Sequence, residues 1–245
     1  MDARLEQRIL ACPTLPSLPA VAVEVVRLCQ REEIDLPEVV KLLERDPALA
    51  AKILRFANSV SVAARSKVTT LTRALTLLGT NSVLTLALSF SLVSSRRRAT
   101  RNGFDHDRYW RRALLSALAA RLLAEEARLD REEAFLAALL QDLGMLALDE
   151  VMPGDYGRIV AASGGDHARL VEREQAALGA DHAEVSAFLV SRWNLPPLVV
   201  ETARGSHDPA RAAAPDAALA AAVACVHVAG ALADVWSGAP VARAV

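Results

Sequence analysis

Aromatic residues are scarce in this chain. They make up only 4% of its 245 residues, although 53% of the residues are hydrophobic. The hydrophobic core must therefore consist mainly of alanine, leucine and valine. Because leucine and alanine are strong helix formers, and because the aromatic residues that favour strands are few, the composition predicts an all-α fold.

Other absences exclude several functional classes. The formal net charge is only −1, so no overall field attracts nucleic acid or an anionic membrane. The three cysteines, Cys12, Cys29 and Cys225, are odd in number and widely spaced, which is typical of neither a disulfide framework nor a zinc motif. No glycine-rich loop follows a strand and no serine lies in a nucleophile elbow. We therefore expect a cytoplasmic protein that does not bind nucleic acid and has no cofactor.

The longest uncharged stretch lies between Asp216 and Asp234. It contains 17 residues, most of them alanine. A membrane-spanning helix needs roughly 20 strongly apolar residues, so we predict a buried core helix here instead. The N-terminus is charged and amphipathic, unlike a signal peptide. The sequence therefore predicts no association with a membrane.

Helix boundaries are marked by aspartate and glycine. An aspartate that precedes an apolar periodic segment is a typical N-cap, and a proline or a further acid in the first turn strengthens the prediction. A glycine after such a segment is a typical helix end. On these grounds we predict helix starts after Asp35, Asp46, Asp130 and Asp181, and a helix end at Gly79.

A polar, basic break occurs at residues 94–103. It contains Arg96, Arg97, Arg98 and Arg101 and ends in a turn signal. Four arginines so close together could bind phosphates. No aromatic residue accompanies them, and we therefore favour a solvated loop at 96–103. This loop divides an N-terminal helical lobe of about residues 1–95 from a C-terminal lobe of about residues 104–240.

Several motifs in order along the chain resemble one known family, the HDOD (HD-related output domain) proteins of bacterial signalling. They are Leu15-Pro-Ser-Leu-Pro19, the segment from Asp46 to Ser59, Thr70 to Gly79, Tyr109-Trp110, Phe135 to Leu148, Asp181-His182 and Trp193-Asn-Leu-Pro196. The resemblance implies one domain at 12–240, with an N-terminal helical bundle and a second bundle similar to HD phosphohydrolases. It also implies a generally non-catalytic role, through protein–protein or nucleotide-linked regulation.

The same resemblance identifies where the metal ligands of an HD enzyme would lie. The first histidine would fall near Arg111 and Arg112. The His-Asp pair becomes Gln141-Asp142, and only its aspartate is a good ligand. The last aspartate would fall at Gly230, one turn before Asp234. Three of the four core ligands are therefore absent.

Two histidines match accessory ligand positions of the related HD-GYP phosphodiesterases. With Asp142, His182 and His207 could form a three-ligand remnant. The alternative is structural: Asp142 pairs with Arg111 or Arg112, His182 is a residue of a first helical turn, and His207 lies in an exposed loop. We favour the second interpretation and predict no metal and no catalytic residue. His106 and His167, in polar surroundings, are expected at the surface.

Three functions follow from these residues. The leading hypothesis is a non-enzymatic signalling module that binds a protein partner. The second is a sensor in which Arg111, Arg112, Gln141, His182 and His207 bind an anion such as a nucleotide phosphate. A residual metal-dependent phosphohydrolase ranks last. A salt bridge at Asp142 would favour the first function, an open basic cleft would favour the second, and a bound ion would favour the third.

Overall fold

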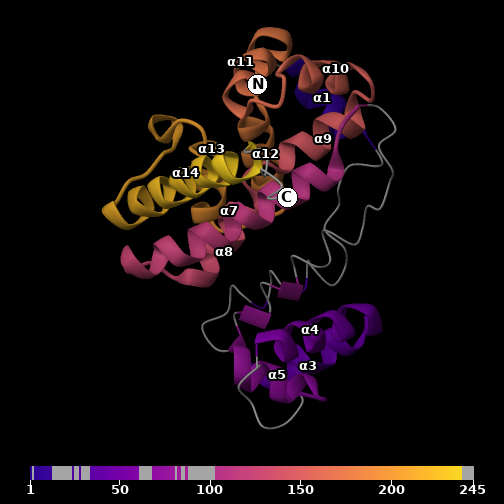
Figure 1. Cartoon of the computed structure of the whole chain (residues 1–245), viewed down its shortest axis with the longest axis vertical. Helices are drawn as coiled ribbons and strands as arrows, with labels where there is room; N and C mark the ends of the chain where they lie inside the picture. Colours follow the sequence, from indigo (N-terminus) through magenta and orange to yellow (C-terminus); the bar gives the residue numbers. More distant parts are fainter. Residues whose placement is uncertain are drawn as a thin grey trace, which may run out of the picture. The chain divides into compact units, whose positions relative to one another are not determined.

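The chain folds into helices, as its composition predicts. The computed structural model describes residues 1, 3–12, 24, 28, 34–60, 68–80, 82–83, 86–87 and 103–238, and the regular elements in these ranges are all helical. Two compact units are present, one of residues 17–97 and one of residues 1–16 with 98–245 (Figure 1). The basic segment 96–102 and the motif at 15–19 lie outside the described residues.

Among the described residues of the smaller unit, three helices have defined bounds. These are α3 (Leu36–Glu44), α4 (Pro47–Val60) and α5 (Leu71–Leu78), and each packs on the other two. Its core consists of aliphatic side chains, among them Leu43, Ile53 and Leu75. The Asn58 side chain also stabilises this unit, through two hydrogen bonds with the backbone of Val68. It donates to the Val68 carbonyl at 2.8 Å and accepts from the Val68 amide at 2.9 Å.

The larger unit contains the remaining described helices. They are α1 (Ala3–Ala11), α7 (His106–Glu126), α8 (Arg131–Leu140), α9 (Leu143–Val151), α10 (Asp155–Ala162), α11 (His167–Leu178), α12 (His182–Arg192), α13 (Pro197–Arg204), the short 3₁₀ helix η1 (Pro209–Arg211) and α14 (Ala217–Gly238). Helix α7 runs beside α8 and α14, while α12 packs on α9 and α13 (Figure 1).

Alanine forms much of the interface around α7. Ala113, Ala117, Ala120 and Ala124 repeat every three or four residues, so they lie on one face of the helix. They pack against alanines of α8 and against the α14 residues Cys225, Val226 and Ala229. Small side chains let the helix axes approach closely, which brings charged residues of α7 and α14 within reach of each other.

The predicted helix boundaries are confirmed at most positions. Asp46, Asp130 and Asp181 each accept a hydrogen bond from a backbone amide of the helix that they start. Asp35 precedes α3 but makes no such side-chain bond. Gly79 ends α5 with a φ of 85°, which favours glycine. The motif from Phe135 to Leu148 is divided between two helices, because α8 ends at Leu140 and α9 begins at Leu143.

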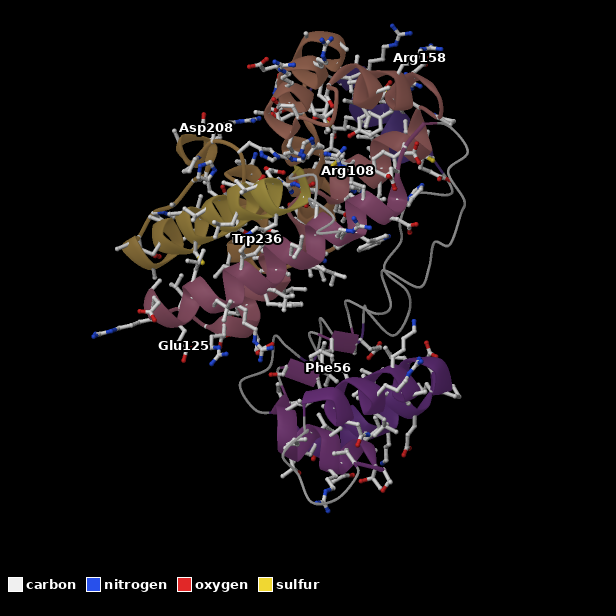
Figure 2. All side chains as sticks on the ribbon, viewed as in Figure 1. Phe56, Arg108, Glu125, Arg158, Asp208 and Trp236 are labelled. Carbon is white, nitrogen blue, oxygen red and sulfur yellow. The ribbon has the colours of Figure 1, made fainter. Side chains whose placement is uncertain are left out.

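Two further expectations differ from the structure. Helix α1, assigned to the N-terminal lobe, belongs to the larger unit, where it contacts α9 and the Met1 amino group lies 2.8 Å from Glu184. Helix α14 is only partly a core helix. Its length and composition would allow it to cross a membrane, and 39% of its most apolar window is buried. One face packs on α7, whereas Val235 and Trp236 are exposed (Figure 2).

Candidate functional site

The candidate site is centred on Asp142, which lies in the short break between α8 and α9. Asp142 is only 2% exposed, so its carboxylate depends on protein groups for all of its polar contacts. The two carboxylate oxygens have different neighbours. Oδ2 contacts an arginine of α7, and Oδ1 is directed at three histidines.

On the Oδ2 side, the guanidinium of Arg112 takes the place of a metal cation. Its Nη1 donates to Oδ2 of Asp142, and its Nε and Nη2 donate to the Asp234 carboxylate at 2.6 and 3.0 Å. This guanidinium is therefore shared between two carboxylates. The predicted pairing of Asp142 with an arginine is present, and the partner is Arg112, whereas Arg111 is exposed.

Gln141 and Gly230 lie beside the same guanidinium. Gln141 Nε2 donates to the Ser116 hydroxyl at 2.5 Å, and its Oε1 is buried without a hydrogen bond. A Cβ built at Gly230 would lie 3.2 Å from that Oε1 and 3.5 Å from Arg112 Nη2. Gly230 thus adjoins the site, where the resemblance placed the last ligand, and offers no side chain to it.

On the Oδ1 side, three imidazoles converge. Nε2 of His182 lies 3.1 Å from Nε2 of His167 and 2.7 Å from Nε2 of His207. Oδ1 of Asp142 lies 3.4, 3.6 and 3.9 Å from Nε2 of His182, His207 and His167, respectively. All four atoms lie within 4.8 Å of one another. This is a compact set of one oxygen and three nitrogen donors.

Helix starts position two of these histidines. His167 and His182 are the first residues of α11 and α12, and the aspartate before each one caps its helix. His207 follows α13, two residues after its C-terminal cap at Gly205. Gly144 permits the close approach of α9 to α12, because a Cβ there would lie 2.1 Å from the His182 carbonyl oxygen.

A buried glutamate orients His182. Oε2 of Glu174 lies 2.6 Å from Nδ1 of His182 and accepts from the His182 amide at 2.9 Å. The Tyr156 hydroxyl donates to the other oxygen, Oε1, at 2.6 Å. All three residues are completely buried. In the neutral form of His182, a proton on Nδ1 that is donated to Glu174 would leave Nε2 as the lone-pair nitrogen, facing the cluster.

The electrostatic surroundings differ among the titratable groups. Burial opposes the charge of Asp142, but Arg112, His182 and His207 hold its pKa well below the usual value. Burial lowers the pKa of both His167 and His207. Burial also opposes a charge on His182, yet Glu174 and Asp142 raise its pKa to about 10. Asp142 is thus ionised at neutral pH, and two of the three imidazoles are neutral.

A cavity of about 490 Å³ opens next to the cluster. His167, Arg112 and Tyr109 line it, together with the turn at residues 163–166. Arg108, labelled in Figure 2, also lines it and donates to the Gly165 carbonyl at 2.7 Å. The carboxylates of Asp105, Asp166 and Asp234 also line the cavity, and the charge of Arg112 is already matched by two carboxylates. It is therefore not an open basic cleft.

The structure brings together most of the residues selected from the sequence. Arg112, Gln141, Asp142, His182 and His207 surround one centre, and only Arg111 points away from it. Three expectations about histidines were wrong. His207 is not an exposed loop residue, since its side chain is 14% exposed, and His167 is a member of the cluster with a side chain only 10% exposed. His106 was also expected at the surface, but its side chain is only 15% exposed.

A signal for His167 is present in the sequence. Gly165-Asp166-His167-Ala168 and Ala180-Asp181-His182-Ala183 share the Asp-His-Ala order, and both aspartates are N-caps. An aspartate followed by histidine at two helix starts places two imidazoles in equivalent positions on their helices. His106 also follows a capping aspartate, but it pairs with Asp149 at 3.3 Å and is not a member of the cluster.

Known structures share this fold. A protein from Shewanella amazonensis SB2B, provisionally named a phosphohydrolase, is 28% identical, with a TM-score of 0.79 over 97% of this chain and 82% of that one. An HDOD domain protein of unknown function from Geobacter sulfurreducens is 23% identical, with a TM-score of 0.77 over 93% and 78% of the two chains. An uncharacterized protein of Treponema pallidum (strain Nichols) is 24% identical over 79% of this chain, which spans only 38% of that relative.

A sequence profile gives the family directly. Residues 15–209 match the HDOD domain, and this range includes Arg112, Asp142 and all three clustered histidines. The match covers well over half of the chain, and its all-helical fold agrees with that of the HDOD neighbour. The chain therefore belongs to the HDOD family.

Proposed function

We propose that this protein is a non-catalytic signalling module that acts by binding a protein partner. The observation that carries the proposal is the double ion pair of Arg112 with Asp142 and Asp234. A hydrolytic HD centre needs open coordination positions on one or two cations that activate water. Here a fixed guanidinium binds one oxygen of Asp142, and neither Gln141 nor Gly230 supplies a ligand on that side.

An apolar stripe on α7 supports the partner-binding part of the proposal. Leu114, Leu118 and Leu122 are 42%, 50% and 64% exposed and recur every four residues, so they lie along one face of the helix. Exposed leucines in such a row are typical of a surface that receives an amphipathic helix of another protein. We therefore propose this stripe as the partner surface.

The sensor hypothesis receives less support. It requires cationic groups that are free to bind a phosphate, but Arg112 is bound by two carboxylates and Arg108 donates to the Gly165 carbonyl. Arg111 is exposed and does not line the cavity. His167 and His207 are neutral at physiological pH because burial lowers their pKa. We therefore expect no measurable heat of binding for cyclic dinucleotides or guanine nucleotides.

The catalytic part is tested by hydrolysis assays on the full chain. Bis(p-nitrophenyl) phosphate and cyclic dinucleotides are supplied with Zn²⁺, Mn²⁺ or Fe²⁺, and product formation is compared with that of Asp142→Ala. We expect both proteins to give the blank rate. Turnover by the wild-type chain that Asp142→Ala abolishes would show that the centre is catalytic.

The partner-binding part is tested by affinity capture from the native cell. The wild-type chain is compared with Leu118→Glu/Leu122→Glu and with Arg158→Glu, a matched control at an exposed position on α10 (Figure 2). We expect a protein that is retained by the wild type and the control and lost from the leucine variant. Equal retention by all three chains, or no retained protein, would contradict the proposed surface.

A further inference from the structure

The histidine cluster has the geometry of a metal site. A tetrahedral zinc ion has ligand bonds of about 2.0–2.1 Å, which places neighbouring ligand atoms about 3.3 Å apart. Five of the six distances among Asp142 Oδ1 and the three Nε2 atoms run from 2.7 to 3.9 Å, and the four ligand atoms all lie within 4.8 Å of one another. These five distances scatter around the tetrahedral value. Side chains from three separate segments and the α8–α9 junction meet at this spacing.

One ligand atom in particular has no other partner. Asp142 Oδ1 is buried and makes no hydrogen bond, although it faces three imidazole nitrogens. A buried carboxylate oxygen without a hydrogen bond is costly, and coordination of a cation would remove that cost. Arg112 does not compete for this atom, because it binds Oδ2 on the other side of the carboxylate.

The charges around the cluster also suit a divalent cation. The carboxylates of Asp142, Asp234 and Glu174 carry three negative charges, and Arg112 supplies one positive charge. A dication that displaces the proton of His182 leaves three neutral imidazoles and balances the remaining two negative charges. Glu174 and His182 also form the carboxylate–histidine pair that commonly supports a metal-bound imidazole, with the 2.6 Å contact at Nδ1.

We propose that Asp142, His167, His182 and His207 form a mononuclear site for a first-row transition cation, with Zn²⁺ the best match. Three imidazoles and one carboxylate are suitable zinc ligands, and four protein ligands close the coordination sphere. Such a closed site stabilises a fold and leaves no position for a reacting water. The inference replaces the expectation that this chain binds no metal, and it does not depend on the proposed partner surface.

The test is metal analysis of the full chain, purified without chelator and without a metal-affinity tag. Inductively coupled plasma mass spectrometry should give about one transition metal ion per chain. Protein stripped with dipicolinate and titrated with Co²⁺ should develop the visible absorption bands of tetrahedral cobalt. These two measurements use the unmodified chain. Less than a tenth of an equivalent of metal, with no cobalt bands, would overturn the proposal.

Variants test whether these residues are the ligands. His167→Gln should weaken Zn²⁺ binding by more than about 100-fold, because a neutral amide is a poor ligand. His106→Gln is the matched control, since its side chain is 15% exposed and lies outside the cluster. Circular dichroism shows that each variant is folded. Zinc binding that is equally strong in both variants would assign the metal to another place and reject this site.

Discussion

The two sides of Asp142 differ in what they can bind. On the Oδ2 side, α7, α14 and the end of α8 provide Arg112, Gly230 and Gln141, none of which is a useful metal ligand. On the Oδ1 side, α11, α12 and the segment after α13 provide three imidazoles. The ligands of an HD-type centre are thus absent on one side, and nitrogen donors remain on the other. One aspartate separates an internal cation from a site suited to a metal.

Arg112 acts as an internal cation that stabilises the Oδ2 side of Asp142. Arg112 is 7% exposed, and its charge is matched by Asp142 and by the half-exposed Asp234. The buried Asp142 would be left without a positive neighbour at Oδ2 if the arginine were absent. The guanidinium therefore replaces the electrostatic role of a metal, while its N–H groups donate and cannot activate water.

The largest effect is expected from Arg112→Met, which removes the internal cation. Breaking a buried ion pair by removing one partner costs about 3–5 kcal/mol, because the remaining charge stays buried. Urea denaturation should show this loss in the free energy of unfolding of the larger unit. Arg111→Met is the control, since Arg111 is exposed and its replacement should change stability by less than about 0.5 kcal/mol. Equal stability of the two variants would contradict a structural role for the ion pair.

The second-largest effect is expected from Gly144→Ala, which tests the close packing of α9 on α12. Gly144→Ala would place a Cβ 2.1 Å from the His182 carbonyl oxygen, so α9 and α12 would have to move apart. We expect a loss of about 3 kcal/mol, measured by thermal unfolding. Gly230→Ala is the matched control, because its Cβ would meet only the ends of the Gln141 and Arg112 side chains, at 3.2 and 3.5 Å. A larger loss for Gly230→Ala would show that the Oδ2 side is the tighter one.

A smaller effect is expected for Glu174→Gln, which acts on the histidine side alone. The carboxylate accepts from Nδ1 and from the backbone amide of His182, and an amide oxygen would support the imidazole less well. Loss of such a supporting group weakens metal binding about 10–100-fold. Competition with a coloured zinc chelator measures the change. An unchanged zinc affinity would show that Glu174 serves only the packing of α11 on α12.

Local signals explain why much of this site was predictable. The N-cap aspartates of α4, α8 and α12 act within one helical turn, so these helix starts can be predicted from adjacent residues. The pairing of Asp142 with an arginine follows from the rule that a buried charge needs a partner. The proximity of Gly230 to Gln141 followed from the family resemblance and not from any local pattern.

The parts that were missed depend on long-range packing. His167 lies 25 residues after Asp142 in a polar segment, and its side chain is covered through contacts with His182 and His207, which come from distant segments. The neighbouring residues give only the Asp-His-Ala order shared with the start of α12, which places His167 at a helix start but does not predict its burial. The position of α1 was missed for the same reason, since Leu5 and Ile9 are buried within the larger unit, far along the chain from their partners.

The smallest effect is expected from Asp166→Ala, which removes the N-cap of α11 directly before His167. The Asp166 carboxylate accepts from the Arg169 amide at 3.1 Å, and loss of an N-cap costs about 1 kcal/mol. Asp166→Asn is the matched control, because asparagine caps a helix almost as well. If the cap also fixes His167, Asp166→Ala should weaken Co²⁺ binding while Asp166→Asn leaves it unchanged. Equal cobalt affinity in both variants, with the stability loss present in only one, would show that packing alone positions His167.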